Sequence, residues 1–352
     1  MTGLHDASGA AKVVSLPQAD ARGEEIREGV LELAEALSLY LGGALNNVRV
    51  AWRLVGPSAA PIVVALGGIS AGRYVTSTGD TKGWWSGIVG PGCALDSSKY
   101  RILGLDFLGG SGDTTGPRAG QTDFPSVSAY DQAEILRRVI DHLGLPRVHA
   151  IVGASYGGMV ALAFAERSPE LVSRIVSISA ADRSHPMSTA WRSVQRAMVR
   201  YALSRGEGAE GLRLARALAM ATYRSPEEFA ARFNGPPLRI EDRYLFPVEQ
   251  YLLARGDAYA GSYLAESFVC LSESIDLHQV DATKITVPCA LVAVREDQLV
   301  PVQDMRSLRA RLAGPTELFE ISSVYGHDAF LKEAEALRPV FARALGAAGE
   351  TA

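Results

Sequence analysis

Residues 148–159 read Val-His-Ala-Ile-Val-Gly-Ala-Ser-Tyr-Gly-Gly-Met and indicate the fold more clearly than any other stretch. The apolar run 148–152 is typical of a buried parallel strand, and residues 157–167 predict a helix. Between them, residues 153–157 fit the pattern G-x-S-x-G, in which a serine lies on a sharp turn between strand and helix. Such a turn lifts the hydroxyl clear of the sheet, so we predict Ser155 as a nucleophile.

A second match to the same pattern lies at residues 68–72, around Ser70. It follows a predicted strand at residues 62–66, but residues 71–78 after it lack the periodicity of a helix. Because the nucleophile needs both the strand and the helix, we do not expect Ser70 to fill that role. Its position after an early strand instead suits the second half of an oxyanion hole.

The predicted oxyanion hole uses two backbone N–H donors. The N–H of Tyr156, which follows the nucleophile, would supply one, and Leu66, Gly67 or Gly68 would supply the other. Each such donor lowers the barrier by about 3–4 kcal/mol. The alternative is that Gly67 and Gly68 merely end a strand.

The candidate base is His327, one of six histidines. Where G-x-S-x-G marks the nucleophile, the partners follow in the order serine, acid, histidine. Only His327 lies after the last predicted strand, at residues 317–322. This position predicts that His327 activates Ser155.

The acid should lie on the loop after the preceding strand, predicted at residues 287–294. Glu296 and Asp297 both follow that strand, and Asp304 lies further along. We predict Asp297, which stands where such an acid turns inward to orient the imidazole and stabilise the imidazolium. Glu296 would then be a solvated loop charge.

Strands and helices alternate along much of the chain, which predicts a mostly parallel sheet flanked by helices. Together with the order of the three candidate residues, this pattern predicts the α/β-hydrolase fold. The predicted strands are residues 38–41, 48–55, 62–66, 101–107, 148–152, 171–179, 287–294 and 317–322, and the predicted helices are residues 128–143, 157–167 and 329–345.

The chain divides into three parts. Residues 1–37 are expected to form an N-terminal tail with an extra helix at residues 23–36. Residues 38–182 and 281–352 form the predicted core. Residues 183–280 are rich in Ala, Leu and Arg at helical spacing, which predicts an inserted helical lid.

Composition and charge exclude several classes of function. A net charge of −4 gives no reason to expect nucleic acid or an anionic membrane as partner. No apolar run approaches the roughly 20 residues that span a bilayer, and residues 1–22 lack the pattern of a signal peptide. Cys93, Cys270 and Cys289 read as reduced, packed thiols, and no Cys/His cluster has metal-ligand spacing. We therefore expect a cytoplasmic protein without a metal ion.

The chain resembles a specific family, the homoserine O-acyltransferases of methionine biosynthesis, from about residue 41 to residue 345. Several motifs taken together carry this resemblance, and they are more specific than the order of the triad alone. They are Gly83-Trp-Trp85, Val89-Gly-Pro-Gly92, Thr115-Gly-Pro117, Gly153-Ala-Ser-Tyr-Gly-Gly-Met159, Ile178-Ser-Ala-Ala-Asp-Arg-Ser-His-Pro-Met187, Thr222-Tyr-Arg-Ser-Pro-Glu-Glu-Phe229, Leu271-Ser-Glu-Ser-Ile-Asp-Leu-His278 and Tyr325-Gly-His-Asp-Ala-Phe-Leu331.

The resemblance implies a ping-pong acyl transfer without a bound cofactor. Ser155 would take an acyl group from acyl-coenzyme A, and the hydroxyl of homoserine would take it from Ser155. Arg224 would hold the acceptor's carboxylate and Asp328 its ammonium group, and Tyr223 would also bind substrate. A lid salt bridge for Arg224 and a helix cap for Asp328 are the alternatives. Because family members often dimerise through lid helices, we expect a homodimer.

Departures from the family pattern bear on the acyl donor. Succinyl-CoA users tend to have Arg two residues after the acid, where a cation would partner the second carboxylate. Here that position is Leu299, followed by Val300, which predicts acetyl-CoA. Against this, residues 66–70 (Leu-Gly-Gly-Ile-Ser) suit a branch often regarded as succinyl-using, and Arg192 or Arg196 could reach in from the lid.

Other functions remain open at the level of sequence. Serine or a specialised hydroxy-amino acid could replace homoserine as acceptor. An esterase would use the same triad with water as acceptor, and a binding protein could keep the fold without catalysis. The complete Ser–Asp–His set argues against the binding protein, and the pair Arg224 and Asp328 favours transfer over hydrolysis.

Overall fold

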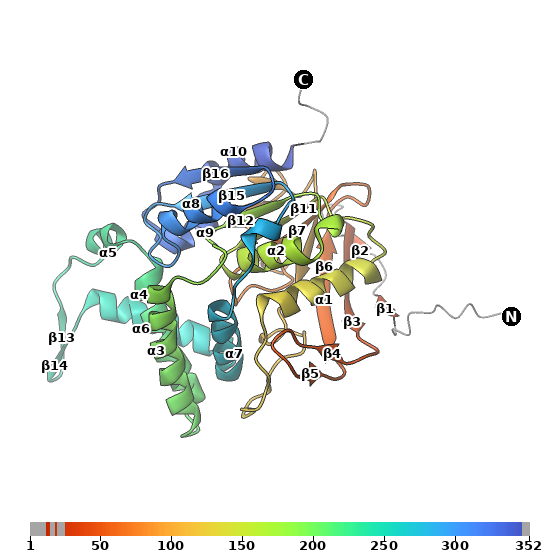
Figure 1. The fold of residues 1–352 in the computed structure, drawn as a ribbon. Coiled ribbons are helices and arrows are strands. Elements are labelled where there is room, and N and C mark those ends of the chain that lie inside the picture. Colours follow the sequence, from red (N-terminus) through yellow and green to blue (C-terminus); the bar gives the residue numbers. More distant parts are fainter. Residues whose placement is uncertain (1–11, 15–17, 20–24, 347–352) are drawn as a thin grey trace.

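The computed structural model describes residues 12–14, 18–19 and 25–346, and strands from both halves of the chain form one large sheet (Figure 1). The strand order is β1-β3-β6-β10-β7-β11-β12-β15-β16, with β2 paired to β3. All neighbours from β10 to β16 run parallel, so the predicted α/β-hydrolase fold is confirmed. The bounds are β1 Lys12–Val14, β2 Gln18–Ala19, β3 Glu25–Glu32, β6 Arg49–Val55, β7 Ile62–Leu66, β10 Arg101–Leu105, β11 Ala150–Ala154, β12 Ile175–Ile178, β15 Cys289–Val294 and β16 Thr316–Ile321.

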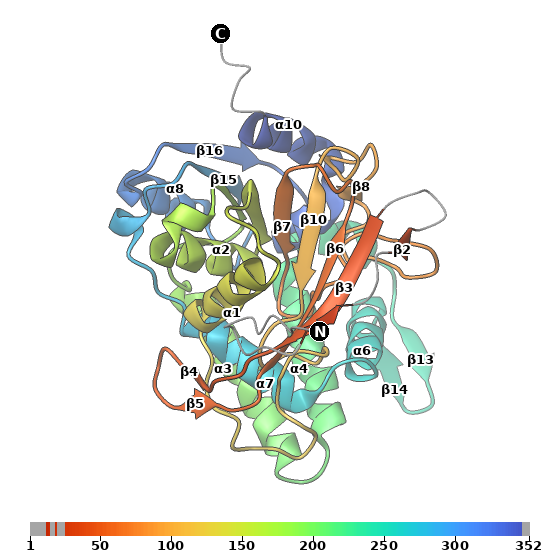
Figure 2. The ribbon, with the colours of Figure 1, turned by 90° about the vertical axis from the view of Figure 1, so that its right-hand side faces the viewer.

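Helices cover both faces of this sheet (Figure 2). On β11, Ile151 packs into the core beneath α1, α2 and α8, whereas Ala150 and Val152 pack into the core beneath α10. Because both faces are buried, such strands are continuously apolar rather than alternating. The helices of the core are α1 Ala129–His142, α2 Tyr156–Arg167, α8 Val302–Arg311, α9 Ala329–Lys332 and α10 Ala334–Leu345, and single-turn 3-10 helices lie at Pro169–Leu171, Ala282–Lys284 and Gly326–Asp328.

The extra helix predicted at residues 23–36 is wrong. Residues 25–32 form β3, which pairs antiparallel with β6. The unpaired edge of β6 offers a row of backbone hydrogen-bonding groups, and this tertiary partner overrides the local helical pattern. The strands β1 and β2 lie within the expected tail and pair with β3. The rest of the expected tail, residues 1–11, 15–17 and 20–24, lies outside the described residues.

Two other predicted elements differ in detail. The turn at Gly42 and Gly43 is present, with φ of +99° and +82°, but it joins the short strands β4 (Leu37–Ser38) and β5 (Ala44–Leu45) rather than a strand at 38–41. The helix predicted at 329–345 is broken at Glu333 into α9 and α10. The remaining small pair is β8 (Val89–Gly90) and β9 (Leu95–Asp96).

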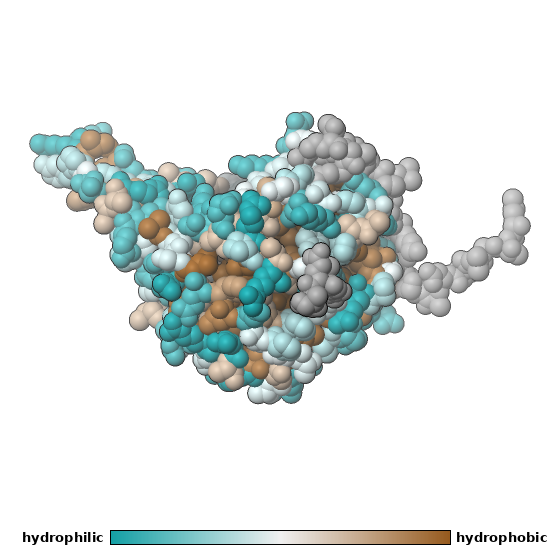
Figure 3. Space-filling model, turned by 90° about the horizontal axis from the view of Figure 1, so that it is seen from above, coloured by the Kyte–Doolittle hydropathy of each residue, from teal (hydrophilic) through white to brown (hydrophobic). Residues whose placement is uncertain are grey.

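Residues 183–280 pack as a separate layer of helices below the sheet in Figure 1. This layer, which we call the lid, contains α3 Pro186–Leu203, α4 Gly208–Tyr223, α5 Pro226–Arg232, α6 Pro247–Ala260 and α7 Ala265–Asp276. A hairpin that the sequence did not predict, β13 (Leu238–Ile240) and β14 (Arg243–Leu245), extends away from the body at the left of Figure 1, and the space-filling view shows a projection on the same side (Figure 3). Within the described ranges, every helix is too short or too polar to cross a membrane.

Candidate active site

Ser155 lies on the turn between β11 and α2, in a strained backbone conformation. Its φ is +54° and its ψ is −122°, a region that residues with side chains rarely occupy and that costs about 1–3 kcal/mol. The neighbouring glycines make the turn possible, because a Cβ on Gly153 would lie 2.1 Å from the carbonyl oxygen of Gly157. A Cβ on Gly157 would lie 2.4 Å from the backbone of Leu66. The turn therefore packs directly against the end of β7.

His327 connects Ser155 to Asp297 through two hydrogen bonds. Nε2 of His327 lies 2.8 Å from Oγ of Ser155, and Nδ1 lies 2.7 Å from Oδ2 of Asp297. Oδ1 of Asp297 accepts the backbone N–H groups of Leu299 at 2.8 Å and Val300 at 3.0 Å. The Asp297 side chain is fully buried, so these bonds replace the water that an ionised carboxylate would otherwise require.

Two opposing effects act on the pKa of His327. Burial lowers this pKa, because a charged imidazolium is costly away from water, but the carboxylate of Asp297 raises it. The net effect places the pKa above the ordinary value of 6.5. A carboxylate at Nδ1 holds the proton there and leaves Nε2 free to accept the hydroxyl proton of Ser155. The arrangement is that of a general base next to a hydroxyl nucleophile.

The other two candidate acids lie elsewhere. Glu296 accepts hydrogen bonds from the hydroxyl of Ser322 and, at 2.8 Å, from the backbone N–H of Ser323, so it ties two loops together while it stays partly exposed. Asp304 lines the cavity described below. Of the three candidates, Asp297 is the one with a hydrogen bond to His327.

Tyr156 is the first residue of α2, a position where the backbone N–H has no partner within the helix. Its side chain points into the core, where the hydroxyl lies 2.6 Å from Oγ of Ser274. The loop after β7 lies beside this N–H, because the N–H of Gly157 donates to the carbonyl of Gly67 at 2.8 Å. The structure thus brings the predicted oxyanion residues together. The choice of Leu66, Gly67 or Gly68 as second donor stays a prediction.

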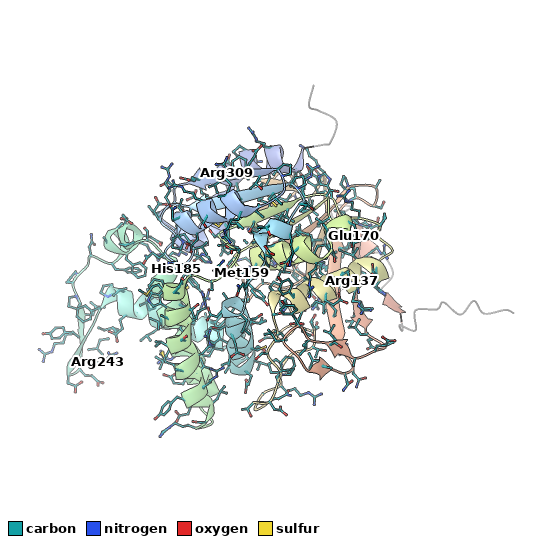
Figure 4. All side chains as sticks on the ribbon, viewed as in Figure 1. Arg137, Met159, Glu170, His185, Arg243 and Arg309 are labelled. Atoms are coloured by element: carbon teal, nitrogen blue, oxygen red, sulfur yellow. The ribbon has the colours of Figure 1, made fainter. Side chains whose placement is uncertain are left out.

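Ser155 and His327 open into a cavity between the core and the lid, which encloses about 1250 Å³ measured out to solvent. The lid contributes both polar or charged and aromatic side chains to its wall, and the polar and charged ones are the more numerous. Met159 on α2 and His185 at the start of α3 both line it, and Figure 4 shows them at the junction of core and lid. Such a concave, partly apolar space next to a nucleophile is typical of a small-molecule site.

The cavity contains a cation and an acid that the triad does not use. Arg216 on α4 lies with its guanidinium 5.3 Å from the ring centre of Tyr223 and 4.6 Å from that of Tyr259. It has no ion pair within the part of the chain that the structure describes. Asp328, the residue after the base, lines the same cavity. The space can therefore receive a ligand with both a negative and a positive group.

Comparison with known proteins identifies the family. The model of the alpha/beta hydrolase fold matches residues 61–334. The chain is 41% identical to a homoserine O-succinyltransferase of Xanthomonas campestris pv. campestris, over 87% of this chain and 81% of that protein. It belongs to the homoserine O-acyltransferase family. A homoserine O-acetyltransferase of Clavibacter michiganensis subsp. michiganensis is 32% identical, over 92% of this chain and 94% of that protein.

The solved structures agree with this assignment at the level of the fold. A homoserine O-acetyltransferase from Bacillus anthracis superposes with a TM-score of 0.82 at 19% identity, covering 92% of this chain and 98% of that one. The family resemblance expected from the sequence motifs is confirmed by the 41% identity to the Xanthomonas protein. As a homoserine O-acyltransferase family member, the chain is an enzyme of the acyltransferase class.

Arg224, the expected partner of the acceptor's carboxylate, and Arg216 lie in different surroundings in this acyltransferase. Arg224 is buried, does not belong to the described lining of the cavity, and forms ion pairs with Asp328 at 3.0 Å and Glu228 at 3.1 Å. Sequence reasoning missed Arg216, which does face the cavity. The sequence did contain a signal for Arg216. It lies seven residues before Tyr223 on one helix, a spacing of two turns that places both side chains on the same face.

Proposed function

We propose that the chain transfers an acyl group from acyl-coenzyme A to the side-chain hydroxyl of homoserine, through an ester on Ser155, as a step of methionine biosynthesis. The observation that carries this proposal is the hydrogen-bonded series Asp297–His327–Ser155, which opens into a cavity that also holds Arg216 and Asp328. The relatives' activities support the same reaction.

In the first half-reaction, Nε2 of His327 takes the hydroxyl proton of Ser155, and Oγ attacks the thioester carbonyl carbon. The carbonyl oxygen gains negative charge, which the N–H of Tyr156 at the start of α2 stabilises together with a donor from residues 66–68. The carbon–sulfur bond then breaks, and His327 returns its proton to the departing thiolate. Asp297 stabilises the imidazolium throughout.

In the second half-reaction, the hydroxyl of the acceptor takes the place that the thiol has left. His327 removes its proton, the hydroxyl oxygen attacks the acyl carbon, and the ester bond to Ser155 breaks. The proton passes from His327 back to Oγ of Ser155. The product is an O-acyl amino acid, and the triad returns to its starting state.

Arg216 and Asp328 are the proposed partners of the acceptor. Arg216, which forms no ion pair with any residue that the structure describes, would bind the α-carboxylate, and Asp328 would bind the ammonium group. Tyr223, which lines the cavity and flanks Arg216, would close one side of this subsite. Arg224 would act indirectly, because its ion pair with Asp328 fixes that carboxylate in place.

Acetyl-CoA is the proposed donor. Leu299 and Val300, two and three residues after Asp297, line the cavity with apolar side chains and supply no cation to receive a second carboxylate. Succinyl-CoA is the second candidate. One observation favours it: Arg192 lines the cavity, and it shares Asp276 with Arg196, at 2.7 Å and 2.6 Å, which leaves one positive charge in excess.

One assay tests the reaction and both substrates. Purified protein is mixed with acetyl-CoA or succinyl-CoA, each with homoserine, serine or no acceptor, and free thiol is followed over time. Transfer to homoserine predicts sustained thiol release only with homoserine present, and O-acylhomoserine by mass spectrometry. Equal release without any acceptor would identify an esterase-like hydrolase instead. A tenfold higher kcat/KM for succinyl-CoA, about 1.4 kcal/mol, would overturn the acetyl preference.

We also propose that the protein is a cytoplasmic homodimer. The lid helix α3 exposes Met187, Val194 and Tyr201, apolar side chains that a partner subunit would cover. Cys93, Cys270 and Cys289 are all free thiols in the described residues, which suits a reducing compartment. Sedimentation equilibrium of the protein and of Tyr201→Glu tests the dimer, because a charge within the contact should shift the mass towards the monomer.

A further inference from the structure

A second hollow adjoins the catalytic cavity. It encloses about 1410 Å³ measured out to solvent. Both spaces share part of their lining, namely Ile69, Ser70, Ala71, Trp84 and Leu331. They therefore meet along the loop that follows β7, close enough for one extended ligand to reach into both.

Two lysines bring positive charge to this hollow. Lys82 and Lys332 line it, and both side chains are exposed. Neither ammonium group has an ion pair or a hydrogen bond within the described part of the chain. Two of the five lysines of the chain therefore stand at this hollow with their charge available to a ligand.

The acid in the same hollow is already neutralised. Asp106 is the one acidic residue among the described residues that line it. Asp106 is buried, forms an ion pair with Arg73, and accepts the backbone N–H of Asp113 at 2.9 Å. The hollow consequently presents a net positive charge to a ligand.

We propose that this hollow binds the phosphate groups of coenzyme A, with Lys82 and Lys332 as their partners. The proposal rests on the acyl transfer proposed above, in which the thioester end of the same molecule lies beside Ser155. The phosphates at the other end carry several negative charges, and burying such groups without cationic partners carries a large desolvation cost. Lysine pairs with phosphate as a compact point charge, and exposed pairs bind weakly enough to release the donor after each cycle.

The other cations near the cavity are less suited to this role. Arg192 is 2.7 Å from Asp276, and Arg183 is 3.2 Å from Asp182. Arg216 lies between two tyrosine rings, where the acceptor is proposed to bind. Trp84 and Leu331 line both the catalytic cavity and the second hollow. On this side, within the described residues, the two lysines are the cations that no carboxylate neutralises.

Calorimetric titration tests the site on the full chain. The titrants are coenzyme A and pantetheine, which lacks the phospho-adenosine part. We expect the Kd for coenzyme A to rise at least tenfold in Lys82→Ala/Lys332→Ala, with pantetheine binding unchanged. The matched control is Lys99→Ala/Lys284→Ala, which removes two exposed lysines that face Asp96 at 3.9 Å and Asp281 at 3.4 Å. This control should bind both titrants as the unmodified protein does.

Either of two results would overturn the proposal: an unchanged Kd for coenzyme A in the Lys82/Lys332 variant, or an equal loss of pantetheine binding. The titration does not depend on turnover, so it separates this proposal from the proposed function. If the lysines hold coenzyme A but no acyl thioester releases thiol, the acyl transfer is wrong and the binding site stands. If acyl transfer proceeds and the lysine variant binds coenzyme A normally, only the binding site is wrong.

Discussion

Nε2 of His327 lies 2.8 Å from Oγ of Ser155, although 172 residues separate them in the chain. This distance is within the range of a hydrogen bond along which a general base takes a proton. Ser155 follows β11, and His327 follows β16. Loops after parallel strands gather at the same edge of a sheet, so the fold brings together two groups that the sequence holds far apart.

Replacing Ser155 by Ala should abolish acyl transfer, because it removes the atom that His327 activates. The loss in kcat should be of the order of 10⁶-fold, as for the nucleophile of another serine triad. Ser70→Ala should retain most activity, since the Ser70 hydroxyl donates only to Tyr259 at 3.0 Å. Thiol release from acyl-CoA with homoserine measures both. Equal inactivity of the two variants would mean that Ser70 takes part in the chemistry.

Asp297→Asn should lower kcat by about 10⁴-fold, because an amide at Nδ1 favours the wrong imidazole tautomer. Glu296→Gln should stay within a few-fold of the unmodified enzyme, since Glu296 contacts Ser322 and Ser323 and not His327. Steady-state rates with saturating substrates separate the two. A comparable loss in Glu296→Gln would leave the identity of the acid undecided.

Arg216→Ala and Asp328→Ala should raise the KM for homoserine while leaving the acylation of Ser155 intact. A lost charge-assisted hydrogen bond is worth about 1.5–3 kcal/mol, which corresponds to roughly 10- to 100-fold in KM. A rapid burst of coenzyme A from acyl-CoA alone should persist in both variants, because the two half-reactions are separable.

Arg213→Ala is the matched control, since Arg213 lies on the same helix and pairs with Glu210 at 2.7 Å. It should leave the KM unchanged. Arg224→Ala should raise the KM less than Arg216→Ala, because Arg224 acts through Asp328. If Arg224→Ala raises it more, Arg224 itself holds the carboxylate, as the sequence predicted.

The acylation rate should fall at acid pH with an apparent pKa above 6.5. Acylation needs the neutral imidazole of His327, and the pKa of this group is raised, since Asp297 outweighs the effect of burial. Protonation therefore removes the base at a higher pH than for an ordinary histidine. In Asp297→Asn the carboxylate is gone and burial remains, so the residual activity should show a lower apparent pKa. An unchanged apparent pKa would show that another group controls the profile.

Local pattern was sufficient to select three residues that the structure joins by hydrogen bonds, Ser155, His327 and Asp297. A buried strand, a glycine-flanked turn and a helix are determined by contacts between near neighbours in sequence, and these placed Ser155. The order along the chain then selected His327 and Asp297 from several candidates. The range of β7, Ile62–Leu66, was predicted to the residue, because a short, continuous apolar run that ends at glycines is typical of a buried parallel strand.

The sequence by itself determined the α/β-hydrolase architecture, the nucleophile turn and the order of the catalytic residues, since these depend on periodicity and turn chemistry. Only the tertiary structure decided that residues 25–32 form β3, because the edge of β6 is a partner that no local pattern reveals. It also decided that Arg216 faces the cavity while Arg224 pairs with Asp328. Which way a long charged side chain points depends on how α4 packs against the core and on where carboxylates from distant segments lie.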